Sequence, residues 1–223
     1  MSKLIDEYFM KHLNLDQSEA FRLHQEYYKN YGLAIEGLVR HHEIDPLEYN
    51  RQVDDALPLE DILSPAPDLE LRKLLEQIDK SKVKMWLFTN AYVNHGKRVV
   101  NILGIEDLFE GLTYCDYGAN PLLCKPAEAM FRKAMREAGV EKMEDCWFIG
   151  MFEKATIDTF RSLTKILDDS SLNCVAAKKL GWSVAHLVEG SGDYQQPADS
   201  NAPIRLSSLQ QLKDVFPQFF KKD

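Results

Sequence analysis

The stretch VKMWLFTN, residues 83–90, is a short apolar run that ends in two polar residues, Thr89 and Asn90. The run has the length of a buried strand, and apolar residues at helical spacing follow it over residues 94–103. The stretch therefore predicts a strand, a turn and a helix, in that order. Units of this kind build parallel sheets that are covered by helices.

The same alternation continues toward the carboxyl end of the chain. Further strands are predicted from short apolar runs, at residues 112–115, 146–149, 183–188 and 204–206. Further helices are predicted from apolar residues at helical spacing, at residues 69–79, 127–138, 172–180 and 209–216. Strands that alternate with helices indicate an α/β fold with a doubly wound parallel sheet. The segment 190–202, rich in Gly, Ser, Asp and Pro, predicts a loop.

The first 63 residues show helical spacing and no strand pattern. The first helix is predicted to end near Asn14, and either Asp16 or Ser18, followed by Glu19, offers an N-cap for the second. The run SPAP at residues 64–67 then interrupts the pattern, because each proline fixes its own φ and disfavours helix in the preceding residue. We therefore predict a helical cap over residues 1–64 and an α/β core over residues 65–223.

Composition and net charge limit the classes of molecule that the protein is expected to bind. The 223 residues carry a formal net charge of −8, whereas a nucleic-acid or anionic-membrane surface needs clustered Lys and Arg. A small solute is the expected partner, and the oligomeric state stays open. No run approaches the roughly 20 apolar residues that span a bilayer, so we expect a cytoplasmic protein, with the nucleus as a further location. The four cysteines have no CxxC spacing and are predicted to be reduced and structural.

Polar residues just after a strand are the first candidates for a site, because ligands bind beyond the carboxyl ends of parallel strands. Thr89 and Asn90 lie at such an end, where a hydroxyl and nearby backbone N–H groups suit a phosphate oxygen. Ordinary turn and capping chemistry is the alternative. Lys125, in LCKP, precedes a predicted helix, where a cation opposes the helix dipole. A bound phosphate or carboxylate would explain that position, and a solvated surface lysine is the alternative.

Two further clusters are candidates for binding. Asp168 and Asp169 are adjacent acids that repel one another unless a cation or solvent screens them, and Mg²⁺ prefers such oxygen ligands. A helix N-cap at Asp169 is the alternative. The tyrosines Tyr27, Tyr28 and Tyr31 could stack on a nucleobase, with core packing as the alternative.

The order of these features resembles the haloacid dehalogenase superfamily. Thr89 matches the second motif of that superfamily, Lys125 the third, and Asp168 with Asp169 the fourth. Three segments resemble the fungal pyrimidine 5′-nucleotidase branch in particular: YYKNYGLAIEGLV at residues 27–39, LFTNAYVNH at residues 87–95 and DDSSLN at residues 168–173. The resemblance covers nearly the whole chain.

The resemblance implies a Rossmann-like core with a helical cap, and Mg²⁺-dependent hydrolysis of pyrimidine nucleoside 5′-monophosphates through an aspartyl-phosphate. Thr89 and the backbone of Asn90 would hold the phosphoryl oxygens, and Lys125 would balance charge on the nucleophile and the phosphate. Asp168 and Asp169 would hold Mg²⁺. The tyrosines of the cap would select the base.

The chain departs from the family pattern at its start. The first motif, an apolar strand ending in DxD, is expected ahead of the cap, whereas this chain begins inside the first cap helix. Neither Asp6 nor the pair Asp54 and Asp55 follows an apolar strand and could replace it. That strand would be the middle of the sheet, so its absence predicts marginal stability and little or no catalysis.

A second departure separates the predicted strand that ends at Ile149 from the acid pair. The family strand runs straight into its acids, whereas residues 150–167, GMFEKATIDTFRSLTKIL, intervene here. We interpret them as a retained intron, because these residues can be encoded with a fungal splice donor and branch point; a surface insertion is the alternative. The hypotheses for function are an inactive or nearly inactive nucleotidase, a non-catalytic relic that binds nucleotides or a partner, and a haloacid dehalogenase.

Overall fold

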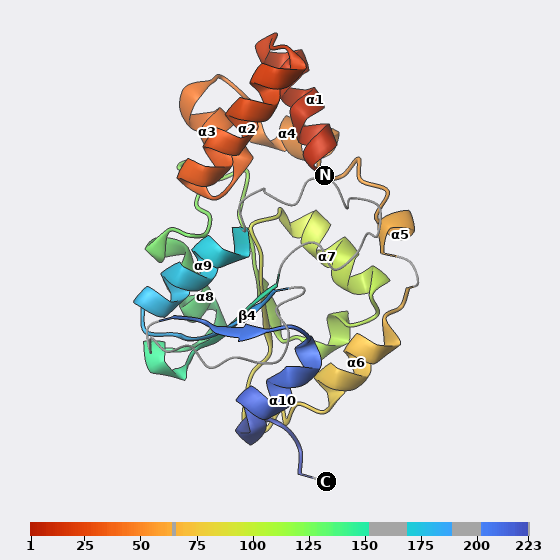
Figure 1. The fold of residues 1–223 in the computed structure, drawn as a ribbon, viewed down its shortest axis with the longest axis vertical. Helices are drawn as coiled ribbons and strands as arrows, with labels where there is room; N and C mark the ends of the chain where they lie inside the picture. Colours follow the sequence, from red (N-terminus) through yellow and green to blue (C-terminus); the bar gives the residue numbers. More distant parts are fainter. Residues whose placement is uncertain (64–65, 152–168, 189–201, 223) are drawn as a thin grey trace.

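The computed structural model describes residues 1–63, 66–151, 169–188 and 202–222. Helices come first along the chain. They are α1 (Ser2–Leu13), α2 (Gln17–Tyr31), α3 (Ala34–His41), α4 (Pro46–Gln52) and α5 (Leu59–Ile62). We call α1 to α4, which form the upper lobe in Figure 1, the helical lobe.

Local residues set the ends of the first helices. Asn14 ends α1 in the left-handed conformation, with φ of 54°. Asp16 and Glu19 form a capping box at the start of α2, in which each side chain accepts the backbone N–H of the other. The end of α1 near Asn14 is as predicted, and of the two predicted candidates for the N-cap of α2 the structure uses Asp16. Gly32 ends α2 with φ of 77°, a conformation that glycine adopts at little cost.

Strands and helices alternate in the rest of the chain. The strands are β1 (Trp86–Phe88), β2 (Gly111–Thr113), β3 (Trp147–Met151), β4 (Ser183–Leu187) and β5 (Ile204–Leu206). The helices are α6 (Leu69–Glu76), α7 (Val93–Ile102), α8 (Glu128–Ala138), α9 (Asp169–Lys179) and α10 (Leu212–Val215), with short 3-10 helices at Glu106–Leu108, Met143–Asp145, Leu209–Gln211 and Pro217–Phe219.

The predicted elements are therefore present, with different bounds. β1 has three residues where the sequence predicted a strand over residues 83–88, and α6 ends three residues before the predicted end at Asp79. β3 continues past Ile149 to Met151, so the first two residues of the segment interpreted as an intron belong to the strand. Residues 152–168 and most of the predicted loop at residues 190–202 lie outside the described residues.

The strands form two separate sheets, and every pairing within them is parallel. β1 pairs with β2, from Trp86 opposite Gly111 to Phe88 opposite Thr113. β4 lies between β3 and β5 in the second sheet. In the described part of the chain, no backbone ladder joins β1 to β3. The α/β class is confirmed.

Helices cover both faces of these sheets. Successive strand residues point to opposite faces, so Val184 packs with Phe131 of α8 and Cys174 of α9, whereas Ala185 packs with Leu74 of α6 and residues of the carboxyl-terminal segment. Figure 1 shows α8 and α9 on one side of β4 and α6 and α7 on the other. This is the layering of a doubly wound fold.

The core of the helical lobe continues into the segment between β2 and α8. Fully buried lobe residues such as Phe9 and Leu38 belong to one apolar cluster with Cys115, Tyr117 and Met130. The described cysteines are reduced and buried, as predicted. The lobe is thus packed on the chain that follows β2, which is where Lys125 lies.

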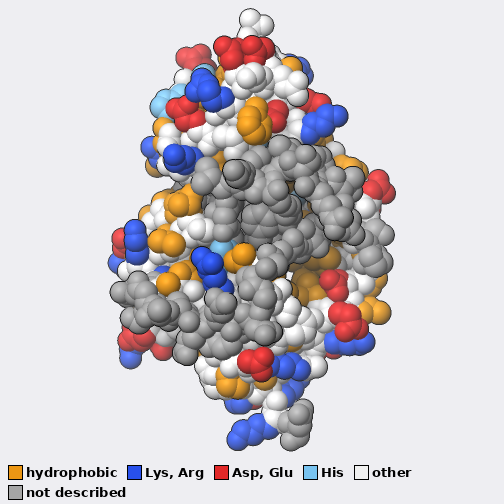
Figure 2. Space-filling view, in the orientation of Figure 1, with side chains coloured by type: hydrophobic (Ala, Val, Ile, Leu, Met, Phe, Trp, Pro, Cys, Tyr) orange, Lys and Arg blue, Asp and Glu red, His pale blue; other side chains and the backbone are white. Residues whose placement is uncertain are grey.

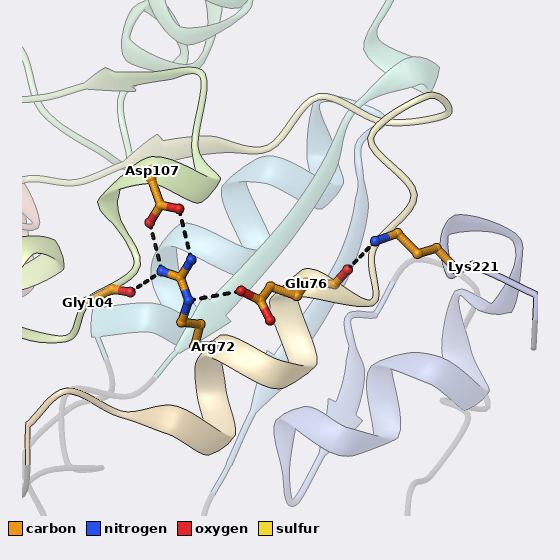
Figure 3. Close-up of polar contacts among 5 residues, drawn as sticks. All are labelled: Arg72, Glu76, Gly104, Asp107 and Lys221. Carbon is orange, nitrogen blue, oxygen red and sulfur yellow. Dashed lines mark hydrogen bonds and ion pairs between the residues drawn. The ribbon is translucent and has the colours of Figure 1, made fainter.

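Arg72 joins α6 to residues 104–107, and Lys221 joins the carboxyl-terminal residues to the same helix (Figure 3). Its guanidinium donates to both carboxylate oxygens of Asp107, at 2.7 and 2.9 Å, and contacts the carbonyl of Gly104 and the carboxylate of Glu76. Lys221 Nζ donates to the backbone carbonyl of Glu76 at 2.7 Å. The pKa of Asp107 is lowered by its bonds to Arg72. This network fixes α6 against the end of α7 and the carboxyl-terminal residues.

The surface carries charges of both signs. On the face shown in Figure 2, Lys and Arg side chains are interspersed with Asp and Glu. None of the helices that the structure describes is long and apolar enough to cross a lipid bilayer.

Candidate active site

Thr89 and Asn90 follow β1 directly and form the turn into α7, as predicted. The Thr89 N–H donates to the carbonyl of Thr113 at 3.0 Å, which continues the β1–β2 ladder. The Thr89 hydroxyl oxygen accepts the N–H of Ala91, also at 3.0 Å. Because successive backbone groups of a strand point to opposite edges, the carbonyl of Phe88 points away from β2, toward the side on which the sheet is divided.

The side chain of Asn90 binds the backbone of Lys125 through both ends of its amide. Asn90 Nδ2 donates to the Lys125 carbonyl at 2.9 Å, and the Lys125 N–H donates to Asn90 Oδ1 at 2.8 Å. Both residues are buried, at 8% and 7% exposure. This reciprocal pair holds two segments together that lie 35 residues apart in the chain. The sequence predicted a role for the backbone of Asn90 and missed this role of its side chain.

The ammonium group of Lys125 lies at the division between the two sheets. Lys125 Nζ donates to the carbonyl of Phe88 at 2.9 Å and lies 4.6 Å from the ring centroid of Phe88, on β1. It also lies 5.4 Å from the ring centroid of Phe148, on β3. The position excludes a solvated surface lysine and places a cation at the carboxyl end of β1, beside Thr89.

The helical lobe touches this lysine segment through the end of α2. A Cβ added to Gly32 would lie 2.6 Å from the Lys125 carbonyl oxygen and 2.4 Å from Pro126 Cδ. Cys124 Sγ lies 3.5 Å from the carbonyl oxygen of Tyr31. The glycine therefore allows a close backbone approach between the lobe and the segment that carries Lys125.

The three candidate tyrosines have different surroundings. Tyr27 is buried, and its ring lies against Gly37 so closely that a Cβ there would be 2.2 Å from Tyr27 Cγ. Tyr31 is partly exposed, and its hydroxyl lies 2.6 Å from Nε2 of His41. Tyr28 is also partly exposed. Tyr27 thus serves core packing, and base stacking stays a prediction that concerns Tyr28 and Tyr31.

Two buried residues that the sequence did not assign to the site lie beside it. The Tyr117 hydroxyl donates to Asp54 Oδ2 at 3.1 Å, and it lies 3.5 Å from the Asn90 carbonyl oxygen. Burial, followed by the charge of Asp54, raises the pKa of Tyr117 well above its ordinary value, so the phenol keeps its proton. Tyr117 stands two residues beyond the second predicted strand, so the search at strand ends would have found it.

The predicted metal ligands are outside the part of the site that can be described. Asp168 lies outside the described residues, and so does the side chain of Asp169, whose backbone begins α9. Among the side chains of residues 1–63, 66–150, 171–188 and 202–222, no three of His, Cys, Asp or Glu gather where they could hold a metal ion. The magnesium site therefore stays a prediction for Asp168 and Asp169.

Comparison with known proteins decides the family. Residues 4–150, well over half of the chain, match the model of the haloacid dehalogenase-like hydrolases. The chain belongs to this family. The Saccharomyces cerevisiae protein named phosphate metabolism protein 8 is 37% identical to it over 227 residues, which cover 96% of this chain. This haloacid dehalogenase-like hydrolase spans 64% of the length of that yeast relative.

Solved structures of other haloacid dehalogenase-like proteins share the fold. A HAD phosphatase from Thermococcus onnurineus matches with a TM-score of 0.54 at 16% identity, over 96% of this chain and 87% of its own. L-2-haloacid dehalogenase from Xanthobacter autotrophicus also matches with a TM-score of 0.54, at 14% identity, over 97% and 92% of the two chains. At such low identity these matches confirm the fold of the hydrolase and leave its reaction open.

Proposed function

We propose that this hydrolase is by descent a Mg²⁺-dependent phosphatase of pyrimidine nucleoside 5′-monophosphates, and that the 223-residue chain binds such nucleotides with little or no turnover. Membership of the hydrolase family and the identity with phosphate metabolism protein 8 support phosphate chemistry. The choice of pyrimidine nucleoside 5′-monophosphates as the substrate rests on the resemblance of residues 27–39, 87–95 and 168–173 to the fungal nucleotidases.

The buried ammonium of Lys125 is the observation that carries the proposal. Asn90 holds the backbone of Lys125, and the Lys125 ammonium bonds the Phe88 carbonyl at the end of β1, against the rings of Phe88 and Phe148. A phosphate group that reaches the same strand end gains charge-assisted bonds from Lys125 and the partial positive charge at the start of α7.

The roles of the proposed site follow from this arrangement. Thr89 and the N–H of Asn90 bind phosphoryl oxygens, and Lys125 balances their charge. Asp168 and Asp169 hold Mg²⁺, which when bound offsets negative charge on the phosphate. Tyr28 and Tyr31 lie on the helix whose end touches the lysine segment, and they contact the base.

Low turnover by these 223 residues is part of the same proposal. No two aspartates of the 223 residues are two positions apart, so they hold no DxD pair of nucleophile and acid. A nucleotide-binding protein without catalysis is the second candidate function. Dehalogenation of a small haloacid is a third, since the fold matches a dehalogenase as well as a phosphatase.

Binding of UMP and CMP, measured by calorimetry, tests the phosphate site. Lys125→Met should weaken binding about tenfold or more, because one charge-assisted contact contributes roughly 1.5–3 kcal/mol. Lys133→Met is the matched control, since Lys133 Nζ also donates to a backbone carbonyl, that of Tyr114 at 3.1 Å, and lies over the Tyr114 ring at 5.2 Å. Equal losses in the two variants would refute the assignment of Lys125.

Release of phosphate from UMP and CMP tests the reaction. The 223-residue chain should release little or none, and a form extended at its amino end by an apolar strand ending in Asp-x-Asp should turn over with Mg²⁺ and stop with a chelator. An extended form that binds nucleotide without turnover would favour the non-catalytic candidate. Halide release that persists in the presence of the chelator would favour the dehalogenase.

A further inference from the structure

Asp54 is a buried carboxylate at the junction of the helical lobe and the candidate site. It lies two residues after the end of α4 and is 4% exposed. The Tyr117 hydroxyl donates to its Oδ2 at 3.1 Å, and Tyr117 itself is 2% exposed. A carboxylate so far from water is costly unless hydrogen bonds stabilise it, so the bond to Tyr117 fixes both side chains in one arrangement.

Tyr117 in turn touches both sides of the turn that follows β1. Its hydroxyl oxygen lies 3.5 Å from the Asn90 carbonyl oxygen, and its ring stacks on that of Tyr92, with centroids 5.4 Å apart and planes at 26°. Tyr92 is the residue before α7. Tyr117 therefore braces the segment from Asn90 to Tyr92, and the Asn90 side chain holds Lys125.

The turn that carries Asp54 is itself held on α7. His95 Nδ1 lies 3.5 Å from the backbone carbonyl oxygen of Asp54. Arg98 donates to the carbonyls of Asp55 and Leu57, at 3.2 and 3.3 Å. Because His95 and Arg98 belong to the helix that begins just after the Thr89–Asn90 turn, the backbone on both sides of Asp54 is fixed on that helix.

We propose that Asp54 is a positioning residue, which sets the place of the Asn90–Lys125 pair through Tyr117. The helical lobe thereby determines whether the phosphate site is assembled. Removing the carboxylate charge weakens the bond that Tyr117 donates, loosens the turn at Asn90 and weakens the hold on Lys125. Asp54 does not touch the substrate in this scheme. The part that concerns nucleotide affinity rests on the proposed function.

Amide hydrogen exchange, measured by NMR, tests the positioning role without any nucleotide. The variants are Asp54→Asn and Tyr117→Phe, and Asp55→Asn is the control, since Asp55 lies in the same turn and accepts from Asn50 Nδ2 at 2.8 Å. The readout is the exchange rate of the Lys125 amide, which donates to Asn90 Oδ1, relative to that of Ala185 in the buried strand β4. The Ala185 amide reports global unfolding, so a rise in this ratio marks a local change at Lys125.

The ratio should rise about tenfold in Asp54→Asn and Tyr117→Phe and stay within twofold in Asp55→Asn. A ratio that is unchanged in the first two variants, or that rises equally in all three, would overturn the proposal. Tyr117→Phe keeps the test decisive if Asp54→Asn does not fold, because it removes one hydroxyl and keeps the ring.

Calorimetry with UMP tests the consequence for the site. The affinity for UMP should fall about tenfold in Asp54→Asn and Tyr117→Phe. The affinity of Asp55→Asn should lie within twofold of that of the chain without substitutions. If the Lys125 amide exchanges faster in these variants while their affinity for UMP is unchanged, the position of Lys125 does not control nucleotide binding, and that part of the proposal is overturned. If the unchanged chain does not bind UMP, the proposed function fails, whereas the exchange ratio still decides the role of Asp54.

Discussion

The two sheets of this hydrolase differ in what stabilises the strand that each places next to the other sheet, β3 in one and β1 in the other. β3 has five residues, and all five pair with β4. β1 has three, and on its side facing the division the carbonyl of Phe88 is bonded by the ammonium of Lys125. The second sheet is thus stabilised by its backbone ladder, whereas the end of the first is fixed by side chains.

Aromatic side chains connect the sheets where the backbone does not. Phe131 of α8 contacts Phe88 of β1, with ring centroids 5.3 Å apart, and Phe148 of β3, at 6.1 Å. It also meets Trp182 edge to face at 5.3 Å. In the described part of the chain, the relative position of β1 and β3 therefore depends on packing, which a single truncation can disturb.

Phe131→Ala is expected to have the largest effect, because it removes the ring that contacts both sheets. A fully buried phenylalanine contributes about 3–5 kcal/mol relative to alanine, so the free energy of unfolding in urea should fall by that amount. Phe21→Ala is the control, since Phe21 lies on α2 and is 37% exposed, and about 1 kcal/mol or less should be lost there. Similar losses in the two variants would show that the aromatic contacts do not hold the sheets together.

Gly32→Ala should have the second largest effect, because it forces apart the lobe and the lysine segment. The added Cβ would overlap the Lys125 carbonyl and Pro126, so a packing cost of about 1–3 kcal/mol adds to about 1–2 kcal/mol for a left-handed alanine. Gly139→Ala isolates the second cost, since Gly139 also ends a helix with φ of 71° and nothing lies within 4 Å of its added Cβ.

Denaturant unfolding of both glycine variants measures how much more stability Gly32→Ala loses than Gly139→Ala. UMP binding should weaken in Gly32→Ala and stay unchanged in Gly139→Ala, because only Gly32 adjoins Lys125. Equal stabilities would mean that the lobe can shift away from the lysine segment at no cost.

The sequence predicted those features that depend on neighbours in the chain. The end of α1 near Asn14 and the start of α2 within residues 16–18 were predicted because a helix cap is a local pattern. The position of Thr89 and Asn90 after β1 followed from an apolar run that stops at polar residues. The predicted β1 was too long, because residues 83–85 are apolar enough for a strand and yet have no strand opposite them in the described sheets.

The contacts that assemble the site were not predicted, because they join distant segments. Asn90 and Lys125 bind one another across 35 positions, and Tyr117 and Asp54 across 63. No local sequence pattern indicates which distant residues will form such a pair. Gly32 was recognisable as a residue that ends a helix, but its contact with Lys125 depends on how the lobe packs.

Asn90→Ala should have an intermediate effect, because it leaves the backbone N–H and carbonyl of Lys125 without the amide that bonds them. A buried polar group that loses its partner costs about 1–3 kcal/mol, so we expect a loss of about 2 kcal/mol in unfolding free energy and weaker UMP binding. Asn101→Ala is the control, since the exposed Asn101 makes one bond of 3.4 Å to Glu106. A loss as small as that of the control would show that water replaces the Asn90 amide.

The smallest effect should come from acidification, and it concerns the helical lobe. His24 of α2 is 4% exposed, and its Nδ1 lies 2.7 Å from Oδ1 of Asp6 on α1. Burial lowers the pKa of His24, and the bond to Asp6 raises it by less, so the folded chain binds a proton less readily than the unfolded chain does. Stability from this residue is therefore complete above about pH 6.5, the ordinary histidine value, and declines as the pH falls below it.

The difference in unfolding free energy between the unchanged chain and His24→Gln isolates this contribution, because the other histidines titrate in both. It should shrink between pH 7.5 and pH 5.5. A difference that grows on acidification would mean that Asp6 outweighs burial and that the protonated pair stabilises the lobe. The two outcomes differ in sign, so the titration decides between burial and ion pairing in the lobe whose packing, at Gly32 and Asp54, adjoins the phosphate site.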